Sequence, residues 1–331
     1  MTPPNPPVAT RTLPYGKAAI AEAAALIAAG AVVAVPTETV YGLAADATDS
    51  RAVAGVYAAK GRPSFNPLIV HVLDRAAAER IAVFDDAAGM LADAFWPGPL
   101  TLVLPLRPDA GIASLVTAGL DTIAIRVPAH RAMRALLAAT GKPLAAPSAN
   151  ASGAISPTRA EHVLASLGGR IPLIVDDGAT EAGLESTIVI TGGGVRVLRP
   201  GPITEEDLAE LFPGEGRGPA SGAIVTGPRP SPGNNFVTAP GQLASHYAPA
   251  KRLRINANAY KSDEWLIGFG AVAGDDTLSA TGDLTEAAAA LFSALYRADA
   301  SDKPRIAVAP VPETGLGVAI NDRLRRAAHR D

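Results

Sequence analysis

Short apolar runs alternate with helical stretches over the first 200 residues of the chain. Strands are expected at 31–35, Leu68–Val72, Leu100–Leu106, Thr122–Val127, Leu144–Ala146, Leu173–Val175, Ser186–Ile190 and Val195–Leu198. Helices are expected over 17–30, 50–60, 74–81, 85–95, 129–140 and 158–167. Since the two kinds of element alternate, this part of the chain predicts an α/β domain around a twisted mixed sheet.

The composition changes to Pro, Gly, Ser and Asn between Pro213 and Pro249, which is typical of a linker. Its end, with His246 and Tyr247, is richer in chemistry than a spacer needs, so we expect a functional linker that acts as a lid. Beyond it, two strands and two helices are expected at Glu264–Gly268, Thr285–Ala298, Arg305–Ala309 and Val318–Ala328. The predicted division is a large domain over 1–212, a linker over 213–249 and a small α/β domain over 250–331.

Charge and residue usage exclude several classes of protein. The formal net charge is −3, so the chain lacks the basic surface that sequence-independent nucleic-acid binding needs. It has no cysteine, which excludes disulfides and thiolate zinc sites. The first residues lack signal-peptide features, and no apolar run approaches the ~18 residues that span a bilayer. A cytoplasmic protein is expected.

Two cations, Lys60 and Arg62, follow a helical stretch and precede a Pro-punctuated loop. If the chain is extended there, both side chains point the same way and could grip one phosphate chain. The alternative is a solvated charge pair at a helix end. The loop position favours ligand contact.

Arg126 lies in an apolar strand whose period of two places it on one face with Thr122. A buried charge is costly unless it is paired. Anion binding and a structural ion pair therefore both remain open for Arg126.

His71 also lies in an apolar strand, where a histidine is more often a core residue than a catalyst. No second ligand stands at metal-binding spacing from it, so no protein-built metal centre is expected. Any Mg²⁺ should arrive with phosphate.

Ser148 and Asn150 follow another apolar run and offer a hydroxyl, an amide and backbone N–H groups to an anion. A local Asx or Ser turn is the alternative. The segment from Glu185 to Ile190 similarly places a small hydroxyl, that of Ser186, at a strand start. The chain has no P-loop, dinucleotide-binding or serine-hydrolase motif, so an ATP site here would be of an unusual kind.

Taken together, the motifs resemble the YrdC-type L-threonylcarbamoyladenylate synthases, in the two-domain form with a C-terminal extension. The resemblance covers essentially the whole chain. It is carried by Pro36–Leu43, Lys60 with Arg62, Pro97–Thr101, Ala124–Pro128, Ser148 with Asn150, Glu185–Ile188, Leu198–Gly201 and Pro240–Pro249. It implies a YrdC-like catalytic domain, the linker, and a small Rossmann-like domain.

The resemblance also implies site residues. The L-threonine pocket would include Thr39, His71, Ala146 and Ser186. ATP would be surrounded by Lys60, Arg62, Asn66, Thr122, Arg126, Ser148, Asn150, Ser156, Arg199 and Tyr247, with Lys60, Arg62 and Arg126 as the catalytic cations. The linker departs from the family pattern, because Gln242–Ser245 lacks the aromatic and basic groups that often precede the His-Tyr pair.

The implied reaction joins L-threonine, bicarbonate and ATP to give threonylcarbamoyl-AMP and pyrophosphate, with Mg²⁺ bound to the nucleotide. The product would pass to a tRNA threonylcarbamoyl-transfer complex, and neither a membrane nor strong direct nucleic-acid binding is expected. The rival interpretations are an RNA-binding module without ATP turnover and a carbamoyl-transfer domain of the hydrogenase-maturation type. The acidic charge balance disfavours the first, and the lack of cysteine excludes the zinc-finger segments that usually accompany the second.

Overall fold

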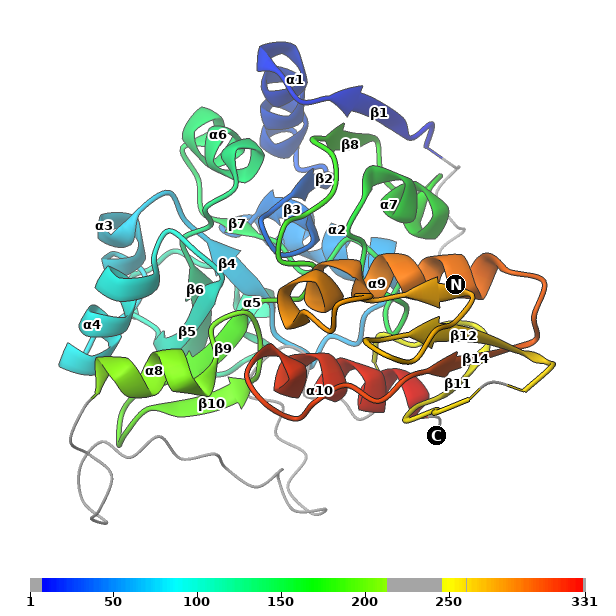
Figure 1. Ribbon diagram of the computed structural model, residues 1–331. Helices are drawn as coiled ribbons and strands as arrows, with labels where there is room; N and C mark the ends of the chain where they lie inside the picture. The colour runs from blue at the N-terminus through cyan, green and yellow to red at the C-terminus, as the bar shows by residue number, and fades with distance from the viewer. Residues whose placement is uncertain (1–7, 213–245, 260, 330–331) are drawn as a thin grey trace.

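Two sheets organise the chain in the computed structural model, which describes residues 8–212, 246–259 and 261–329 (Figure 1). The first sheet has ten strands in the order β1-β8-β2-β3-β7-β4-β6-β5-β9-β10. Their bounds are β1 Arg11–Pro14, β2 Val33–Pro36, β3 Tyr41–Asp46, β4 Ile69–His71, β5 Leu100–Pro105, β6 Thr122–Arg126, β7 Leu144–Ala145, β8 Leu173–Asp176, β9 Thr187–Ile190 and β10 Arg196–Arg199. Parallel pairs such as β4 with β6 and antiparallel pairs such as β2 with β3 make it a mixed sheet.

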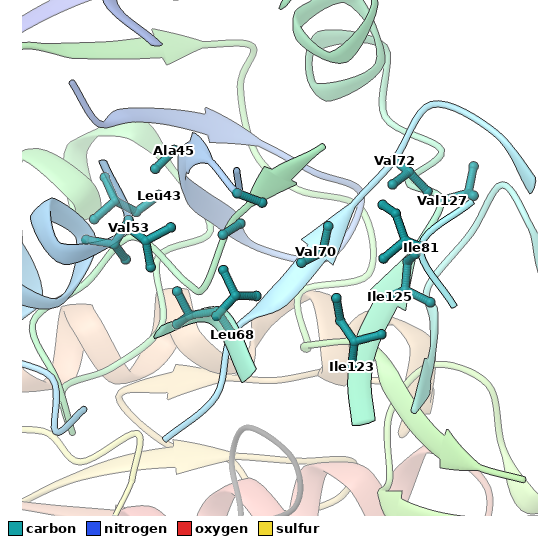
Figure 2. Packing of buried hydrophobic residues seen from close by; sticks show 14 of the residues in the cluster. Leu43, Ala45, Val53, Leu68, Val70, Val72, Ile81, Ile123, Ile125 and Val127 are labelled. Carbon is teal, nitrogen blue, oxygen red and sulfur yellow. The ribbon is translucent and has the colours of Figure 1, made fainter. Parts of the chain in front are cut away.

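Helices cover both faces of this sheet. They are α1 Lys17–Ala28, α2 Ser50–Lys60, α3 Arg75–Glu79, α4 Asp86–Phe95, α5 Ser114–Thr117, α6 Arg131–Thr140, α7 Ala160–Leu167 and α8 Glu205–Leu211. Helices α1 and α6 cover one face, and the larger core forms under the others. Alternation along β2 divides its side chains between the faces, with Val33 and Val35 on the α1 side and Ala34 on the other. In Figure 2, Leu43 and Ala45 of β3 lie beside Val53 of α2 in the larger core.

The second sheet has four parallel strands in the order β11-β14-β12-β13. Its elements are β11 Arg252–Arg254, β12 Glu264–Gly268, β13 Asp276–Thr277, α9 Leu284–Ala300, β14 Arg305–Val308 and α10 Leu316–Ala328. Helix α9 lies between this sheet and the first domain (Figure 1). Thr158 and Ser293 share a hydrogen bond of 3.0 Å, and the Tyr296 hydroxyl donates to the Ile155 carbonyl at 2.9 Å. The two domains therefore pack directly on each other.

The predicted fold class is confirmed: a twisted mixed-sheet α/β domain is followed by a small α/β domain with a parallel sheet. The strand β3, the short strands β1, β11 and β13 and the helices α5 and α8 were not expected from the sequence. Residues 213–245 of the expected linker lie outside the described residues. The boundaries at 212 and 249 stay a prediction. Within the described part of the chain, no helix is long and apolar enough to cross a membrane.

Candidate active site

A pocket opens at the first sheet where its strand ends meet residues 246 and 247. It is lined by Thr37, Thr39, Val40, Gly42, Arg62, Ile69, His71, Arg126, Ala146, Pro147, Ser148, Glu185, Ser186, Arg199, His246 and Tyr247. The space free of protein atoms is about 540 Å³ including open solvent, but the centre of a water molecule can reach only about 50 Å³ of it. That interior has room for a few water molecules.

The turn between β2 and β3 supplies the first polar wall of the pocket. Thr37 Oγ1 donates to the Val40 carbonyl at 2.7 Å and lies 2.8 Å from Thr39 Oγ1. These local bonds are those of a threonine-stabilised turn, and they fix the hydroxyl of Thr39 at the lining. The predicted threonine-site residue Thr39 thus lies in the pocket.

Strand β6 carries Arg126 to the same place. Its Nη1 donates to Thr39 Oγ1 at 3.0 Å, its Nε donates to the Gly98 carbonyl at 3.1 Å, and its Nη2 lies 2.6 Å from Glu38 Oε1. Burial opposes the charge on Glu38, but the Arg126 cation outweighs it and lowers the pKa of that carboxyl. Both alternatives for Arg126 are thus compatible with the structure: it forms the ion pair and also lines the pocket.

Arg199 and Ser186 are joined at the opposite wall. Arg199 Nη2 donates to the Ser186 carbonyl at 2.9 Å and to its hydroxyl oxygen at 3.1 Å. Ser186 Oγ also lies 2.7 Å from Thr101 Oγ1. Burial lowers the pKa of Arg199. Because Arg199 is shielded from water, its attraction to an entering anion is stronger than that of an exposed arginine.

Arg62 is held by carbonyls of the loop that follows it. Its Nε donates to the Asn66 carbonyl at 3.2 Å and its Nη2 to the Pro67 carbonyl at 2.9 Å, and burial lowers its pKa to about 10. Asn66 is fully buried, and neither polar atom of its side chain has a hydrogen-bond partner among the described residues. Arg62 lines the pocket, whereas Asn66 lies outside its lining.

Lys60 does not lie beside Arg62 in the way an extended chain would place it. It is the last residue of α2, and Gly61 caps that helix at a φ of 60°. Lys60 Nζ donates to the carbonyls of Ser148 and Asn150, both at 2.5 Å. The chain is therefore not extended at Lys60, because the helix continues through this residue, and the condition for Lys60 and Arg62 to point the same way is not met. Its ammonium instead holds the loop that carries Ser148.

His71 and Ala146 meet on neighbouring strands. His71 pairs in register with Arg126 of β6, and the Ala146 N–H donates to the Ile69 carbonyl at 2.9 Å. Burial lowers the pKa of His71 to about 3, and its Nδ1 has no partner in the described structure. The imidazole is therefore neutral at physiological pH. Both residues line the pocket, and their contact with L-threonine stays a prediction.

The Ser-x-Asn segment divides its two polar side chains. Ser148 lines the pocket, whereas Asn150 is buried behind it and its Nδ2 donates to the carbonyls of Ala151 and Ala154. Asn150 thus folds its own loop, in the manner of a local turn. Its proposed contact with ATP would be indirect in this conformation.

Two further predicted ATP contacts lie outside the lining. Thr122 begins β6 opposite Pro105, at the other end of the strand from Arg126. Ser156 is fully buried, and its hydroxyl has no hydrogen-bond partner in the part of the chain that the structure describes. The structure does not bring these two side chains into the pocket.

His246 and Tyr247, near the end of the expected linker, also line the pocket. Both are buried, and their rings meet edge to face at 4.0 Å between centroids. Burial lowers the pKa of His246 well below its usual value and raises that of Tyr247. Tyr247 has a φ of 63°, a conformation that a non-glycine residue rarely holds outside functional or strained sites. Because both side chains line an interior of only about 50 Å³, a ligand larger than a few water molecules needs these side chains to move.

Sequence reasoning missed three residues at or behind the pocket. Thr37 and Glu185 line it, and Arg323 of α10 pairs with Glu185 at 2.8 Å. Thr37 and Glu185 stand in segments that were singled out, but no pattern marks their side chains. Arg323 reads as one of several cations on an amphipathic helix, so its burial could not be seen from the sequence.

The fold and the pocket define a class of α/β protein in which buried arginines, small hydroxyls and a neutral histidine converge without a protein-built metal cluster among the described residues. Such a set suits an anionic ligand with a small polar companion.

Comparison with known proteins narrows this class. Residues 25–201 match the Sua5/YciO/YrdC family model, described as telomere recombination, and residues 203–329 match the C-terminal domain of threonylcarbamoyl-AMP synthase. The chain belongs to the two-domain Sua5 family of threonylcarbamoyl-AMP synthases.

Two relatives and one solved structure illustrate the match. The chain is 41% identical to threonylcarbamoyl-AMP synthase of Bacillus subtilis, over 93% of this chain and 92% of the relative. It is 39% identical to that of Pyrococcus abyssi, over 92% of this chain and 93% of the relative. The crystal structure of P. abyssi Sua5 complexed with L-threonine has a TM-score of 0.84 at 35% identity, covering 97% of both chains.

Proposed function

We propose that this chain makes threonylcarbamoyl-AMP and pyrophosphate from L-threonine, bicarbonate and ATP, as a nucleotidyltransferase that serves tRNA modification. The observation that carries the proposal is the meeting of three buried arginines, Arg62, Arg126 and Arg199, with Ser186 and Ser148 around one pocket. Membership of the threonylcarbamoyl-AMP synthase family supports it.

The residue roles are those that the resemblance implies, sorted by whether each side chain lines the pocket. L-Threonine would contact Thr39, His71, Ala146 and Ser186. ATP would contact Arg62, Arg126, Arg199, Ser148 and Tyr247 directly, whereas Lys60, Asn66, Thr122, Asn150 and Ser156 would support its site or reach it after rearrangement. Small hydroxyl groups suit the hydroxyl and carboxylate of threonine, and the guanidinium groups suit phosphate.

No side chain has to act as a covalent nucleophile. The amine of threonine and bicarbonate would form a carbamate with loss of water, and the carbamate carboxylate would then attack the α-phosphorus of ATP and release pyrophosphate. The chain's contribution is to hold both reactants in contact and to neutralise phosphate charge with Arg62, Arg126 and the ammonium of Lys60. Because charge interactions strengthen when water is excluded, burial of these groups raises the effect of each.

Mg²⁺ would be held mainly by the nucleotide. The pocket lining contributes a single carboxylate, from Glu185, and the described residues contain no group of three acidic or histidine ligands. This donor set fits a cation that keeps phosphate oxygens and water as most of its ligands. When bound, Mg²⁺ supplies further neutralisation of phosphate charge.

Nucleotide entry requires a more open pocket than the one described. The interior of about 50 Å³ is far below the roughly 300–1,000 Å³ of ordinary ligand sites. His246 and Tyr247 are buried in the lining of that interior, so these two side chains would have to move aside for ATP. A lid role for the remainder of the expected linker concerns residues outside the described structure and stays a prediction.

The hand-off of the product to a tRNA threonylcarbamoyl-transfer complex, and a cytoplasmic location, belong to the same proposal. Both rest on membership of the threonylcarbamoyl-AMP synthase family rather than on a feature of the pocket.

The test is pyrophosphate release from ATP by the full chain, with L-threonine and bicarbonate present together or omitted one at a time. Release that needs both is expected, and release that is indifferent to bicarbonate would reject the reaction. Arg62→Ala should raise the KM for ATP by about 10- to 150-fold, because a charge-assisted contact contributes roughly 1.5–3 kcal/mol. Arg51→Ala, an exposed arginine on α2, is the matched control and should leave the KM unchanged.

A further inference from the structure

A single arginine of the second domain, Arg323, lies directly behind the pocket wall. It is completely buried, with 0% of its side chain exposed. Its Nε donates to Glu185 Oε2 at 2.8 Å and its Nη2 to the Glu185 carbonyl at 3.4 Å. Its guanidinium carbon also lies 5.2 Å from the centre of the Tyr247 ring. One side chain of α10 therefore contacts two residues that line the pocket of the other domain.

The segment that carries Glu185 is gripped by the second domain at other points as well. Leu184 is fully buried within the hydrophobic core of the second domain. At Gly183, an added Cβ would lie 2.4 Å from the Ala288 carbonyl oxygen and 2.5 Å from the Cα of Ala289, both in α9. Residues 183–185 thus follow the surface of the second domain, and Ser186 comes next along the chain.

Residues of the first domain also pack closely against this segment. At Gly201, an added Cβ would lie 2.4 Å from the backbone nitrogen of Thr187 and 2.7 Å from the Glu185 carbonyl oxygen. Arg199 holds the backbone and hydroxyl of Ser186. The position of Ser186 is therefore set by both domains together.

The ion pair with Arg323 does not saturate Glu185. Asp322 takes a second bond from Arg323, at 3.0 Å from its Nη1, while Glu185 Oε1 has no partner among the described residues. The charge on Arg323 is opposed by burial but favoured by Tyr247, Glu185 and Asp322, which together raise its pKa. A contact that served only to dock two domains would not need a residue of the pocket lining as its acceptor.

We propose that Arg323 is a positioning residue for the reaction: it holds Glu185, and through it fixes Ser186 at the threonine side of the pocket. The second domain then supports the active site although none of its described residues lines the pocket. This inference rests on the proposed function, because it concerns the threonine contact of Ser186.

The experiment compares Arg323→Met, Arg323→Lys, Glu185→Gln and the double variant Glu185→Gln/Arg323→Met in the full chain. The KM values for L-threonine and for ATP and the kcat are measured for pyrophosphate release, and thermal unfolding reports folding. Arg325→Met is the control, since Arg325 lies on the same helix but is 41% exposed and pairs with the exposed Glu313. It should leave all three kinetic values unchanged.

Arg323→Met should raise the KM for threonine by about 10- to 100-fold, with at most a threefold change in the KM for ATP. Arg323→Lys should recover part of the loss, because it keeps a cation near Glu185. A purely structural role would lower the amount of folded enzyme and hence the apparent kcat, while both KM values stayed at the wild-type level. That result would overturn the proposal.

The double variant keeps the test valid if Arg323→Met alone does not fold, since it removes the uncompensated buried carboxylate together with the cation. If Arg323 acts through Glu185, the double variant should bind threonine no more weakly than Glu185→Gln. Additive losses would show that Arg323 acts by another route and would overturn the proposal. Failure of the proposed function is distinguishable, because the unchanged chain would then show no threonine-dependent pyrophosphate release.

Discussion

The two domains differ in what they bury. The charged side chains buried in the first domain are Glu38, Lys60, Arg62, Arg126, Glu185 and Arg199. Among the described residues of the second domain they are Glu264 and Arg323, and Arg323 finds its partner in the first domain. Burying an ion costs several kcal/mol before its partner is counted.

This difference separates the work of the two domains. The first domain bears the cost of buried charge at and behind the pocket, as expected where a protein gives up stability for function. The second domain has a mainly apolar core that includes Val40, Ile155 and Leu184 of the first domain. It therefore stabilises the region around the pocket by apolar packing.

The largest effect expected from this comparison concerns Arg126 and Glu38. Arg126→Met leaves the Glu38 carboxylate buried without its cation, which should lower the free energy of unfolding by about 3–5 kcal/mol. The measurement is urea denaturation of the full chain. In the second domain, Arg297→Met removes the partner of Asp276, but Arg297 is 54% exposed, so the loss should stay within about 1 kcal/mol. Equal losses of unfolding free energy in the two variants would contradict the difference between the two domains.

A smaller effect concerns the neutral histidine of the first domain. The pKa of His71 is about 3 in the folded chain, whereas a free histidine has a pKa near 6.5. Between these values the unfolded chain binds one more proton than the folded one, so stability falls as the pH falls from about 6.5 towards 3. The slope from this group approaches about 1.4 kcal/mol per pH unit.

His71→Gln should flatten the pH dependence of the free energy of unfolding by that amount, measured by denaturation between pH 4 and 7. If the variant and the unchanged chain have the same slope, His71 takes up a proton in the folded state. In that case the site would hold a cation rather than a neutral ring, and the contrast between the domains would need another explanation.

Sequence patterns predicted the elements well where the pattern is local. The period of two in β6 correctly placed Arg126 inside a strand, and α2 was expected over its observed range. The order of strands was not predictable, because β3 and β7 pair across about 100 residues and the second of them has only two residues. Short strands carry too little pattern to be recognised.

Prediction of the site was also limited by the separation of interacting residues along the chain. The resemblance placed Thr39, His71 and Ser186 at the pocket, but local reasoning could not show that the side chain of Lys60, at the end of α2, turns to the loop of Ser148. Arg323 could not be recognised, because its partner Glu185 is 138 residues away along the chain. In both cases the partner of a charge is fixed by the tertiary fold.

The smallest effect tests whether the two domains unfold together. Asp49 caps α2 in the first domain, accepting from the backbone N–H of Arg51 at 2.7 Å, and Asp283 caps α9 in the second, accepting from that of Glu286 at 2.8 Å. Replacing either by Ala should cost about 1 kcal/mol. Because α9 contributes to the core that both domains share, Asp283→Ala and Asp49→Ala should shift the same single denaturation transition by similar amounts.

The comparison is made by urea denaturation, followed both by far-UV circular dichroism and by pyrophosphate release. A separate early transition in Asp283→Ala that leaves pyrophosphate release intact would show that the second domain unfolds by itself. Its apolar core would then not support the charged interior of the first.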